Sequence, residues 1–372
     1  MGNWRTCQLG EVITFQRGHD LPKSKMQRGE FPVVGSNGII GYHNEYTTDA
    51  PSVTIGRSGN VGRPFLYKGR SWSHNTSLYI KEYKNVDPIF IYYLLQTLDL
   101  GNYAGGSAVP TLNRNHIHTI SVNIPIERNE QHQIALVLSV IDEKIEINTK
   151  INENLAQQAL AVFLHIFADS ESVTPATIAD VALNVTDGVH NTVHDDPEGD
   201  YLLLSCKNIK GGSLSIGASE RRINSDTFEK LRRRTKLAKG DVLISSVGTI
   251  GELLLLNVEP SNYEFQRSVA IVKPNPTVVS SAYLYESLVS KKAELINASH
   301  GAVQQCLFIS DIAGFPIGIP TSEDLQIFDE IVAPMFDAIS ANEAESMRLA
   351  ALRDTLLPRL MSGELDVSEL SL

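Results

Sequence analysis

The strongest hydrophobic pattern of the chain runs from Gln131 to Phe167. Spacings of three and four residues alternate strictly along it, which is typical of a coiled-coil seam rather than of an ordinary amphipathic surface. The seam positions are Leu138, Ile141, Ile145, Asn148, Asn152, Leu155, Ala159, Val162 and Ile166. The pattern predicts one helix over 131–167, about 55 Å long at a rise of about 1.5 Å per residue.

A second helix follows the same pattern 194 residues later. The shift carries Ile134, Leu138, Ile141, Ile145, Asn148, Asn152 and Leu155 onto Phe328, Val332, Met335, Ile339, Asn342, Ser346 and Leu349. Because a helix with one apolar stripe is unstable alone in water, we expect the two helices to pack antiparallel, with the shared polar positions fixing the register. Pro334 removes a backbone amide, so it should kink the second helix or mark its start. The alternative is two unrelated surface helices.

The remaining sequence repeats as well. SVTIGRSGNVG (52–62) resembles DVLISSVGTIG (241–251), in which a β-branched strand leads to a turn at Gly59 or Gly248. NTSLYIK (75–81) resembles RSVAIVK (267–273), and an Ala-Val pair, Ala108-Val109 or Ala302-Val303, recurs in GGSAVPTLN (105–113) and HGAVQQCLF (300–308). A period of this length is too long for a solenoid, so it indicates a duplicated domain.

These patterns predict an α+β fold with pseudo-two-fold symmetry. Two similar domains, each with a mixed β-sheet and short helices, are joined by two long antiparallel coiled-coil helices. The predicted bounds are 1–126 and 169–320 for the domains, 127–168 and 321–362 for the helices, and 363–372 for a C-terminal tail.

The composition is that of a soluble globular protein. Of the 372 residues 42% are hydrophobic and 20% charged, and no apolar run approaches the roughly 20 residues that span a bilayer. Three scattered cysteines form no disulfide framework and favour a cytoplasmic location. The net charge of −11 disfavours nucleic acid, but residues 221–239 hold eight basic side chains against two acidic ones. This basic stretch is either one specific anion contact or a solvated helix face.

Signatures of catalysis are absent from the sequence. It contains neither a GxxxxGK[ST] phosphate loop nor a GxGxxG motif after a strand. Acid-x-Lys triplets of the kind that many nucleases use occur at 82–84 and 142–144, without a clear partner acid. HIH (116–118) and HNTVH (190–194) have metal-ligand spacing but no further ligand of evident purpose. We therefore expect no catalytic, cofactor or metal site in this chain.

Polar loops between the strands are the remaining chemical feature. Examples are GSNGIIGYHNEY (35–46), GRSGN (56–60), WSHNTS (72–77), SCKNIKGG (205–212) and QRSV (266–269). Their arginine, asparagine, glutamine, serine and threonine side chains are those that read base edges and bind phosphates. The same residue types are ordinary turn formers, so composition leaves both interpretations open.

Several motifs occur twice and in the same order. They are LGEVITFQRGHDLP and IADVALNVTDGVH, VTIGRSGNVG and VLISSVGTIG, and the loops GSAVPTLN and GAVQQCL, followed at the end by RLAALRDTLLPRLMSGEL (348–365). The ordered set resembles, over the whole chain, the specificity (S) subunit of type I restriction–modification enzymes. The chain departs from a regular pattern where VPTLN becomes VQQCL and where FLHIFADSES (163–172) replaces the usual helix ending.

The resemblance implies a non-catalytic, DNA-binding subunit of a defence system against foreign DNA. Each domain would be a target-recognition domain that reads one half of a bipartite double-stranded DNA site, and the helices would set the spacing. The subunit would bind two methyltransferase (M) subunits and, optionally, motor-nuclease (R) subunits. S-adenosylmethionine, ATP and Mg would be bound by those partners only, and no membrane contact is implied.

Candidate DNA-binding residues follow from chemistry and from analogous position in the two domains. The base-reading candidates are Ser36, Asn37, Arg57, Ser58, Asn60, His74, Asn75, Thr76, Lys207, Asn208, Ser245, Ser246, Thr249, Gln266 and Arg267. The phosphate-binding candidates are Arg221, Arg222, Arg232, Arg233 and Arg234. The candidates for the register of the helix pair are Asn148, Asn152, Asn342 and Ser346. Two other functions stay open: a duplicated-domain protein–protein scaffold that does not bind DNA, and an enzyme in its own right.

Overall fold

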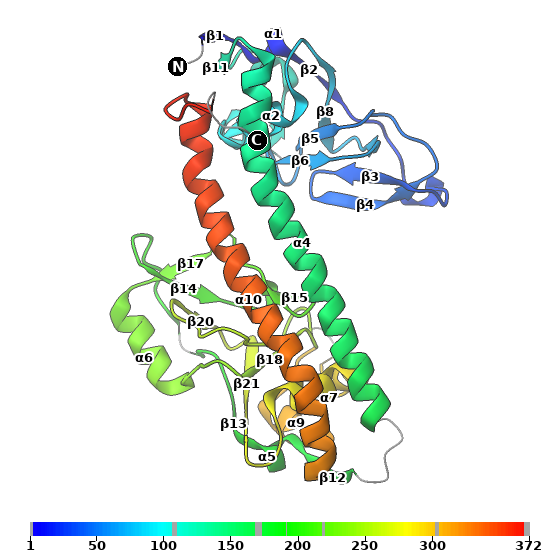
Figure 1. The fold of residues 1–372 in the computed structure, drawn as a ribbon, viewed down its shortest axis with the longest axis vertical. Helices are drawn as coiled ribbons and strands as arrows, with labels where there is room; N and C mark the ends of the chain where they lie inside the picture. Colours follow the sequence, from blue (N-terminus) through cyan, green and yellow to red (C-terminus); the bar gives the residue numbers. More distant parts are fainter. Residues whose placement is uncertain are drawn as a thin grey trace. The chain divides into compact units, whose positions relative to one another are not determined.

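The computed structural model describes residues 3–105, 110–167, 173–190, 192–217, 220–301 and 305–367. The chain divides into two compact units: unit 1 is Met1–Glu146 with Ser346–Leu372, and unit 2 is Ile147–Glu345. Each unit holds its own sheets and one part of each of two 40-residue helices, α4 (Arg128–Phe167) and α10 (Ser322–Met361) (Figure 1). The two Ala-Val pairs of the repeat lie outside the described residues.

Unit 1 is built on a four-stranded sheet, β2–β8–β5–β6, and a three-stranded sheet, β4–β3–β7, with the pairs β1–β11 and β9–β10 beside them. The strands are β1 (Trp4–Gln8), β2 (Ile13–Arg17), β3 (Phe31–Gly35), β4 (Gly38–His43), β5 (Ser52–Gly56), β6 (Pro64–Tyr67), β7 (Trp72–Ser73), β8 (Ser77–Tyr83), β9 (Ala104–Gly105), β10 (Thr111–Leu112) and β11 (Ser121–Pro125). The helices are α1 (Leu9–Val12), α2 (Pro88–Gln96) and α3 (Arg114–His118), with 3-10 turns η1 (Lys23–Lys25) and η2 (Leu100–Tyr103).

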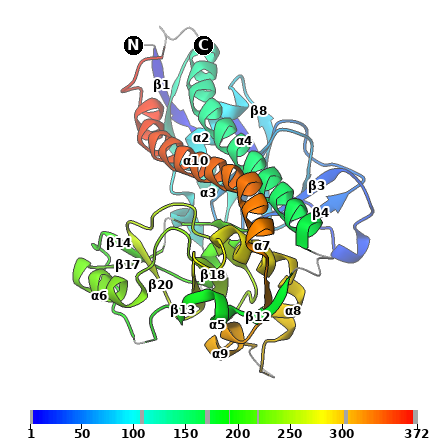
Figure 2. The same cartoon turned by 60° about the horizontal axis from the view of Figure 1, so that its bottom comes forward.

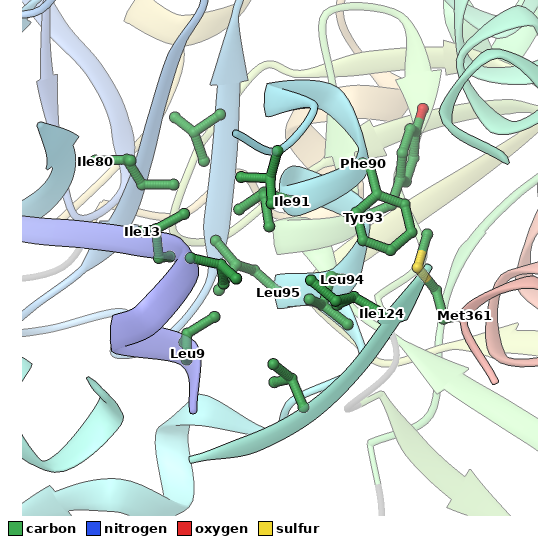
Figure 3. Packing of buried hydrophobic residues seen from close by; sticks show 14 of the residues in the cluster. Leu9, Ile13, Ile80, Phe90, Ile91, Tyr93, Leu94, Leu95, Ile124 and Met361 are labelled. Carbon is green, nitrogen blue, oxygen red and sulfur yellow. The ribbon is translucent and has the colours of Figure 1, made fainter. Parts of the chain in front are cut away.

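Helix α2 shows why the local sequence folds as it does. The Asp87 carboxylate accepts hydrogen bonds from the backbone amides of Ile89 at 2.8 Å and Phe90 at 3.0 Å, which satisfies donors that a helix start leaves free. A proline follows the cap, at a position where no amide is needed. The apolar face of α2 enters the core of unit 1, where Met361 of α10 and Ile124 of β11 pack close to it (Figure 3).

Unit 2 repeats this plan with a four-stranded sheet, β13–β21–β18–β19, a three-stranded sheet, β17–β14–β20, and the pair β12–β22, and it adds the pair β15–β16. The strands are β12 (Thr174–Thr177), β13 (Ala182–Asp187), β14 (Tyr201–Leu204), β15 (Ile209–Lys210), β16 (Ser213–Leu214), β17 (Arg221–Ile223), β18 (Val242–Ser245), β19 (Leu253–Leu255), β20 (Tyr263–Phe265), β21 (Val269–Pro274) and β22 (Pro316–Ile319). The helices are α5 (Ile178–Val181), α6 (Ser225–Thr235), α7 (Ser281–Ser290), α8 (Lys292–Asn297) and α9 (Ile309–Ala313), with a 3-10 turn η3 (Cys206–Asn208).

The two units share more than strand order. In both, the three-stranded sheet contains one parallel pair, β3–β7 or β14–β20, which makes the sheets mixed. In both, the turn after the central strand has two glycines with positive φ, at +85° and +81° in unit 1 and at +79° and +81° in unit 2. The predicted α+β fold with duplicated domains is confirmed. Helix α6 packs beside β20 (Figure 2). Neither α6 nor the β15–β16 hairpin has a counterpart among the described residues of unit 1.

Helices α4 and α10 pack antiparallel within each unit. In unit 1, Arg353 of α10 donates to the carboxylate of Asp142 of α4 at 2.8 Å, and Leu360 lies in the same core as Ile134. In unit 2, the rings of Phe163 and Phe328 meet with centroids 6.0 Å apart. Contacts toward the end of one helix are therefore made with the beginning of the other, as the seam predicted.

Two roles were expected for Pro334, a kink in the second helix or its start, and helix α10 excludes the second. It begins at Ser322 and continues through Pro334, so Pro334 does not mark its start. Pro334 is exposed, on the side of the helix away from the buried Val332 and Phe336. Within the described residues, no helix is long and apolar enough to span a membrane.

Candidate nucleic-acid interface

The polar loops of unit 1 meet at one edge of its four-stranded sheet. Strands β2 and β5 both pair antiparallel with β8, so their carboxyl ends lie at the same edge as the amino end of β8. Strand β6 is antiparallel to β5 and begins at this edge too. The edge therefore gathers three loop segments that are distant in sequence. We call residues 17–20, 57–63 and 74–76 edge 1.

Backbone hydrogen bonds hold edge 1 together. The amides of Arg57 and Ser58 donate to the carbonyl oxygen of Thr76, at 2.8 and 3.2 Å. The amide of His19 donates to the carbonyl oxygen of Ser73 at 2.7 Å. The Thr76 hydroxyl accepts from the amide of Ser36 at 3.3 Å and ties the β3–β4 turn to the same place. The side chains at edge 1 are thus positioned by a backbone that is hydrogen-bonded to the sheet.

Edge 1 is rich in positive charge. Arg17 is exposed and Arg57 is half-buried, and neither forms an ion pair with any of the residues that the structure describes. Burial, and secondly the neighbouring charge of Arg17, lower the pKa of Arg57. Asn75 donates from its side-chain amide to Asp20 at 2.6 Å, which leaves its carbonyl oxygen available. Exposed guanidinium and amide groups on a rigid edge suit recognition of base edges.

Unit 2 forms the equivalent edge with different side chains. We call residues 187–190, 246–252 and 266–268 edge 2. The amide of Ser246 donates to the carbonyl oxygen of Ser268 at 2.9 Å, and that of Arg267 donates to Val189 at 3.1 Å. Asp187 accepts from His190 at 2.5 Å and lies 3.8 Å from Arg234 of α6. Asp187 of edge 2 is therefore already paired with basic side chains.

The structure separates the base-reading candidates into two groups. The exposed or half-buried ones that lie on the edges or on the adjoining turns are Asn37, Arg57, Ser58, Asn60, His74, Asn75, Thr76, Lys207, Thr249, Gln266 and Arg267. Among these, Lys207 forms an ion pair with Glu220 at 2.9 Å. Burial lowers the pKa of His74, although the nearby Asp20 acts in the opposite direction.

Four candidates are buried and are poorly placed to reach bases: Ser36, Asn208, Ser245 and Ser246. The Ser245 hydroxyl accepts from the amide of Glu252 at 2.8 Å and is also bonded to the carbonyl oxygen of Thr249. The Asn208 side chain accepts from Ser205 and donates to Ser215, each at 2.9 Å. Their polar groups complete turns inside the unit, which is the other role that their composition allowed.

Four of the five phosphate-binding candidates are engaged within unit 2. Arg232 donates to the carbonyl oxygens of Pro260 at 2.7 Å and Tyr263 at 2.9 Å, and its Nε bonds the fully buried Glu264. Arg221 pairs with Asp195. The other two bond carbonyl oxygens: Arg222 that of Gly199 and Arg234 that of Asp187.

Arg233 is the remaining candidate. It is exposed on α6 and makes no ion pair within the described residues. The guanidinium of Arg232 instead offsets the buried charge of Glu264, so it is poorly placed to bind phosphate.

The two histidine motifs were considered as metal-ligand candidates in the sequence. Among the described residues, no group of three or more His, Cys, Asp or Glu side chains is arranged to bind a metal ion. His118 accepts a hydrogen bond from the amide of Phe15 at 3.0 Å, and burial lowers its pKa. Two residues of edge 1, Arg17 and His19, are not among the candidates that the sequence singled out. The sequence signals for them are the repeated motif LGEVITFQRGHDLP, in which both lie, and the glycine between them, which follows β2.

Comparison with known proteins decides the family. A family model for the type I restriction modification DNA specificity domain matches residues 1–157. The type I restriction enzyme MjaIX specificity subunit of Methanocaldococcus jannaschii is 31% identical over 316 residues, covering 76% of this chain and 70% of that protein. The chain belongs to the specificity subunits of type I restriction enzymes. Like its relatives, this specificity subunit is the non-catalytic component, and catalysis in type I systems resides in partner subunits.

Further similarities agree with this specificity-subunit assignment. The HindI specificity subunit of Haemophilus influenzae is 22% identical over 365 residues, covering 75% of this chain and 77% of that protein. The crystal structure of a type I restriction–modification S subunit from M. genitalium matches 96% of both chains with a TM-score of 0.58 and 17% identity, which shows a common fold. The resemblance inferred from the ordered motifs is confirmed.

Proposed function

We propose that this specificity subunit reads a bipartite DNA target, with edge 1 on one half-site and edge 2 on the other. The observation that carries the proposal is the equivalent sheet edge in each unit, built on the same backbone hydrogen bonds but presenting different side chains. Arginine pairs well with guanine, and asparagine or glutamine pairs well with adenine, in the major groove. Arg233, exposed on α6, would contact phosphate and add affinity without sequence preference.

The helices α4 and α10 would hold the spacing between half-sites and dock two M subunits. Each is one uninterrupted helix of 40 residues, about 60 Å long at about 1.5 Å per residue. Apolar side chains stay exposed on them: in unit 2, Ile147 and Ile151 of α4 are 50% and 42% exposed, one turn apart. Exposed apolar residues at helical spacing suit an amphipathic partner helix. S-adenosylmethionine, ATP and Mg would bind to the M and R subunits.

The test uses the complex of this chain with the M subunits of its own system. Sequencing of DNA methylated by the complex gives the target, and gel-shift titration then compares that duplex with a scrambled one. We expect a shift at substantially lower protein concentration for the target. Equal affinity for both duplexes would contradict sequence reading, and no binding of either would favour a scaffold that does not contact DNA.

Docking of the M subunits has its own test. The double variant Ile147→Asp/Ile151→Asp places charge on the exposed α4 face without touching the seam. We expect loss of the M-containing complex in size-exclusion chromatography, while circular dichroism stays unchanged. As a matched control, Gln157→Asp changes an exposed residue of the same helix. Assembly equal to wild type in the double variant would remove this face from the docking site.

A further inference from the structure

Hydrogen bonds align the two edges residue by residue. In unit 1 the amide of Leu112 donates to the carbonyl oxygen of Arg57 at 2.8 Å, and in unit 2 the amide of Leu307 donates to that of Ser246 at 2.9 Å. The amides of Arg57 and Ser246 donate to corresponding loops, as described above. Arg57 and Ser246 therefore occupy the same position of the duplicated fold.

The last residue of the outer strand aligns in the same way. Arg17 ends β2 and pairs with Leu78 of β8, while Asp187 ends β13 and pairs with Ala270 of β21. The glycine that follows donates from its amide to the carbonyl oxygen of the first residue of β8 or β21, at 3.0 Å in both units. Arg17 in unit 1 thus corresponds to Asp187 in unit 2.

Arg63 of unit 1 and Glu252 of unit 2 are a third pair of corresponding residues. The carbonyl oxygen of Arg63 accepts from the amide of Gly56 at 3.1 Å, and that of Glu252 accepts from the amide of Ser245 at 2.8 Å. Three arginines of edge 1 therefore stand where edge 2 has an aspartate, a serine and a glutamate. Glu252 is paired with Lys292 at 2.7 Å, so edge 2 neutralises its acids internally.

The three arginines of edge 1 differ in the contacts that they make within unit 1. Arg63 lies over the ring of Phe65, with its guanidinium carbon 5.5 Å from the ring centre. Arg17 and Arg57 have no such contact and no ion pair within the described residues, although the charge of Arg17 helps to lower the pKa of Arg57. Two neighbouring guanidinium groups without a counter-charge weaken a fold, so a ligand with acceptor atoms is the expected partner.

We propose that Arg17 joins Arg57 as a guanine-reading pair of unit 1, and that unit 2, with Asp187 and Ser246 at the same positions, reads a half-site without this contact. The inference rests on the proposed function. It adds Arg17 as a specificity-determining residue and guanine as the base that the arginine pair reads. Guanine offers O6 and N7 as two acceptors in the major groove, which match the two donors of a guanidinium fork. The two half-sites would consequently differ in base composition.

The experiment sequences DNA methylated by complexes with M subunits that contain wild-type chain, Arg17→Ala, Arg57→Ala or Arg267→Ala. We expect each edge 1 variant to lose preference at a guanine in one half-site, by about 5- to 150-fold. The other half-site should stay as in wild type and should be the one that Arg267→Ala relaxes. Arg17→Lys keeps the charge but not the fork, so it should relax the same guanine. Arg5→Ala, an exposed arginine of β1, is the control.

Three outcomes would overturn the inference. One is a wild-type half-site of unit 1 that contains no guanine. Another is an unchanged motif in Arg17→Ala with weaker binding to every duplex, which would make Arg17 a phosphate ligand. A third is relaxation of the same half-site by Arg17→Ala and Arg267→Ala. Failure of the proposed function looks different, because the wild-type complex itself would then show no bipartite motif.

Discussion

Asn342 donates a hydrogen bond from its side-chain amide to the side-chain oxygen of Asn152, at 2.8 Å, across the seam between α10 and α4 in unit 2. Asn148 lies one turn away and donates to Glu345 at 2.8 Å. These amides interrupt an otherwise apolar seam. We call these asparagines the amide layer. Since a slipped register would leave amides in the seam without partners, the amide layer favours one alignment of the two helices at some cost in packing energy.

Asn152→Ala should therefore destabilise unit 2. The change removes one partner and leaves the amide of Asn342 in the seam, which costs about 1–3 kcal/mol. Urea unfolding followed by circular dichroism measures the free energy of unfolding. Gln157→Ala on the exposed side of α4 is the control, for which we expect less than about 0.5 kcal/mol. A smaller loss for Asn152→Ala than for the control would contradict the role of the amide layer.

Arg232 and Arg233 should separate into a structural and a DNA-binding residue. Arg232→Ala leaves Glu264 buried without its cation, so we expect a loss of about 3–5 kcal/mol in unfolding free energy. Arg233→Ala should unfold like the wild type but bind all duplexes less tightly. The slope of the logarithm of affinity against the logarithm of salt concentration should become shallower by about one, which corresponds to one lost phosphate contact. An unchanged salt slope would count against Arg233 as a phosphate ligand.

Unit 2 should lose stability as the pH rises toward 8. Glu286 of α7 is 1% exposed, its carboxylate oxygens have no hydrogen-bond partner within the described residues, and burial raises its pKa to about 8. Burial also raises the pKa of Glu343 of α10 to about 7, against the effect of its hydrogen bond to Asn257. Both groups bind their protons more tightly in the folded state. Their stabilisation is complete below the ordinary glutamate pKa of about 4.3 and is lost as the pH passes the folded values.

Glu286→Gln should flatten this dependence. Between pH 5 and 8 each such group contributes a slope of up to about 1.4 kcal/mol per pH unit. Hydrogen exchange of α7 at pH 6 and 8 measures the local stability. Fluorescence of Trp4 and Trp72, which both lie in unit 1, is the internal control. Equal pH slopes of α7 protection in the wild type and the variant would refute the assignment to Glu286.

Arg267→Ala should relax sequence preference in one half-site only. Arg267 is exposed on edge 2, and its backbone amide is held by Val189 at 3.1 Å, so the change removes a side chain without disturbing the turn. We expect a loss of about 1–3 kcal/mol in binding to the target and a broader methylated motif on one side. Unchanged affinity together with an unchanged motif would remove Arg267 from the readers.

The helices were the most predictable part of this fold. A seam that runs from Leu138 to Ile166 repeats the same constraint many times, and its repetition later in the chain adds an independent test. Strand order was less accessible, because β2, β5 and β8 pair across dozens of residues. Arg17 could not be placed beside Arg57 from the sequence for this reason: their proximity depends on the β2–β8–β5 order, which local patterns do not encode.

Polar loops were predictable as loops but not residue by residue. Ser245 and Arg267 both lie in short polar turns, and each residue type can read a base. The structure uses the first to close a turn onto Glu252 and leaves the second exposed. The role of Arg232 was not predictable for the same reason. Consecutive arginines on a helix point in different directions, and Arg232 forms an ion pair with the buried Glu264. Side-chain direction, which composition does not contain, decides each case.

The most direct test of the account is the pattern of methylated positions left by the wild-type complex in DNA that carries no other methylation. The account predicts two short specified sequences separated by a fixed number of unspecified base pairs, with both halves required for modification. One uninterrupted specified sequence, or methylation that needs only one of the halves, would contradict it.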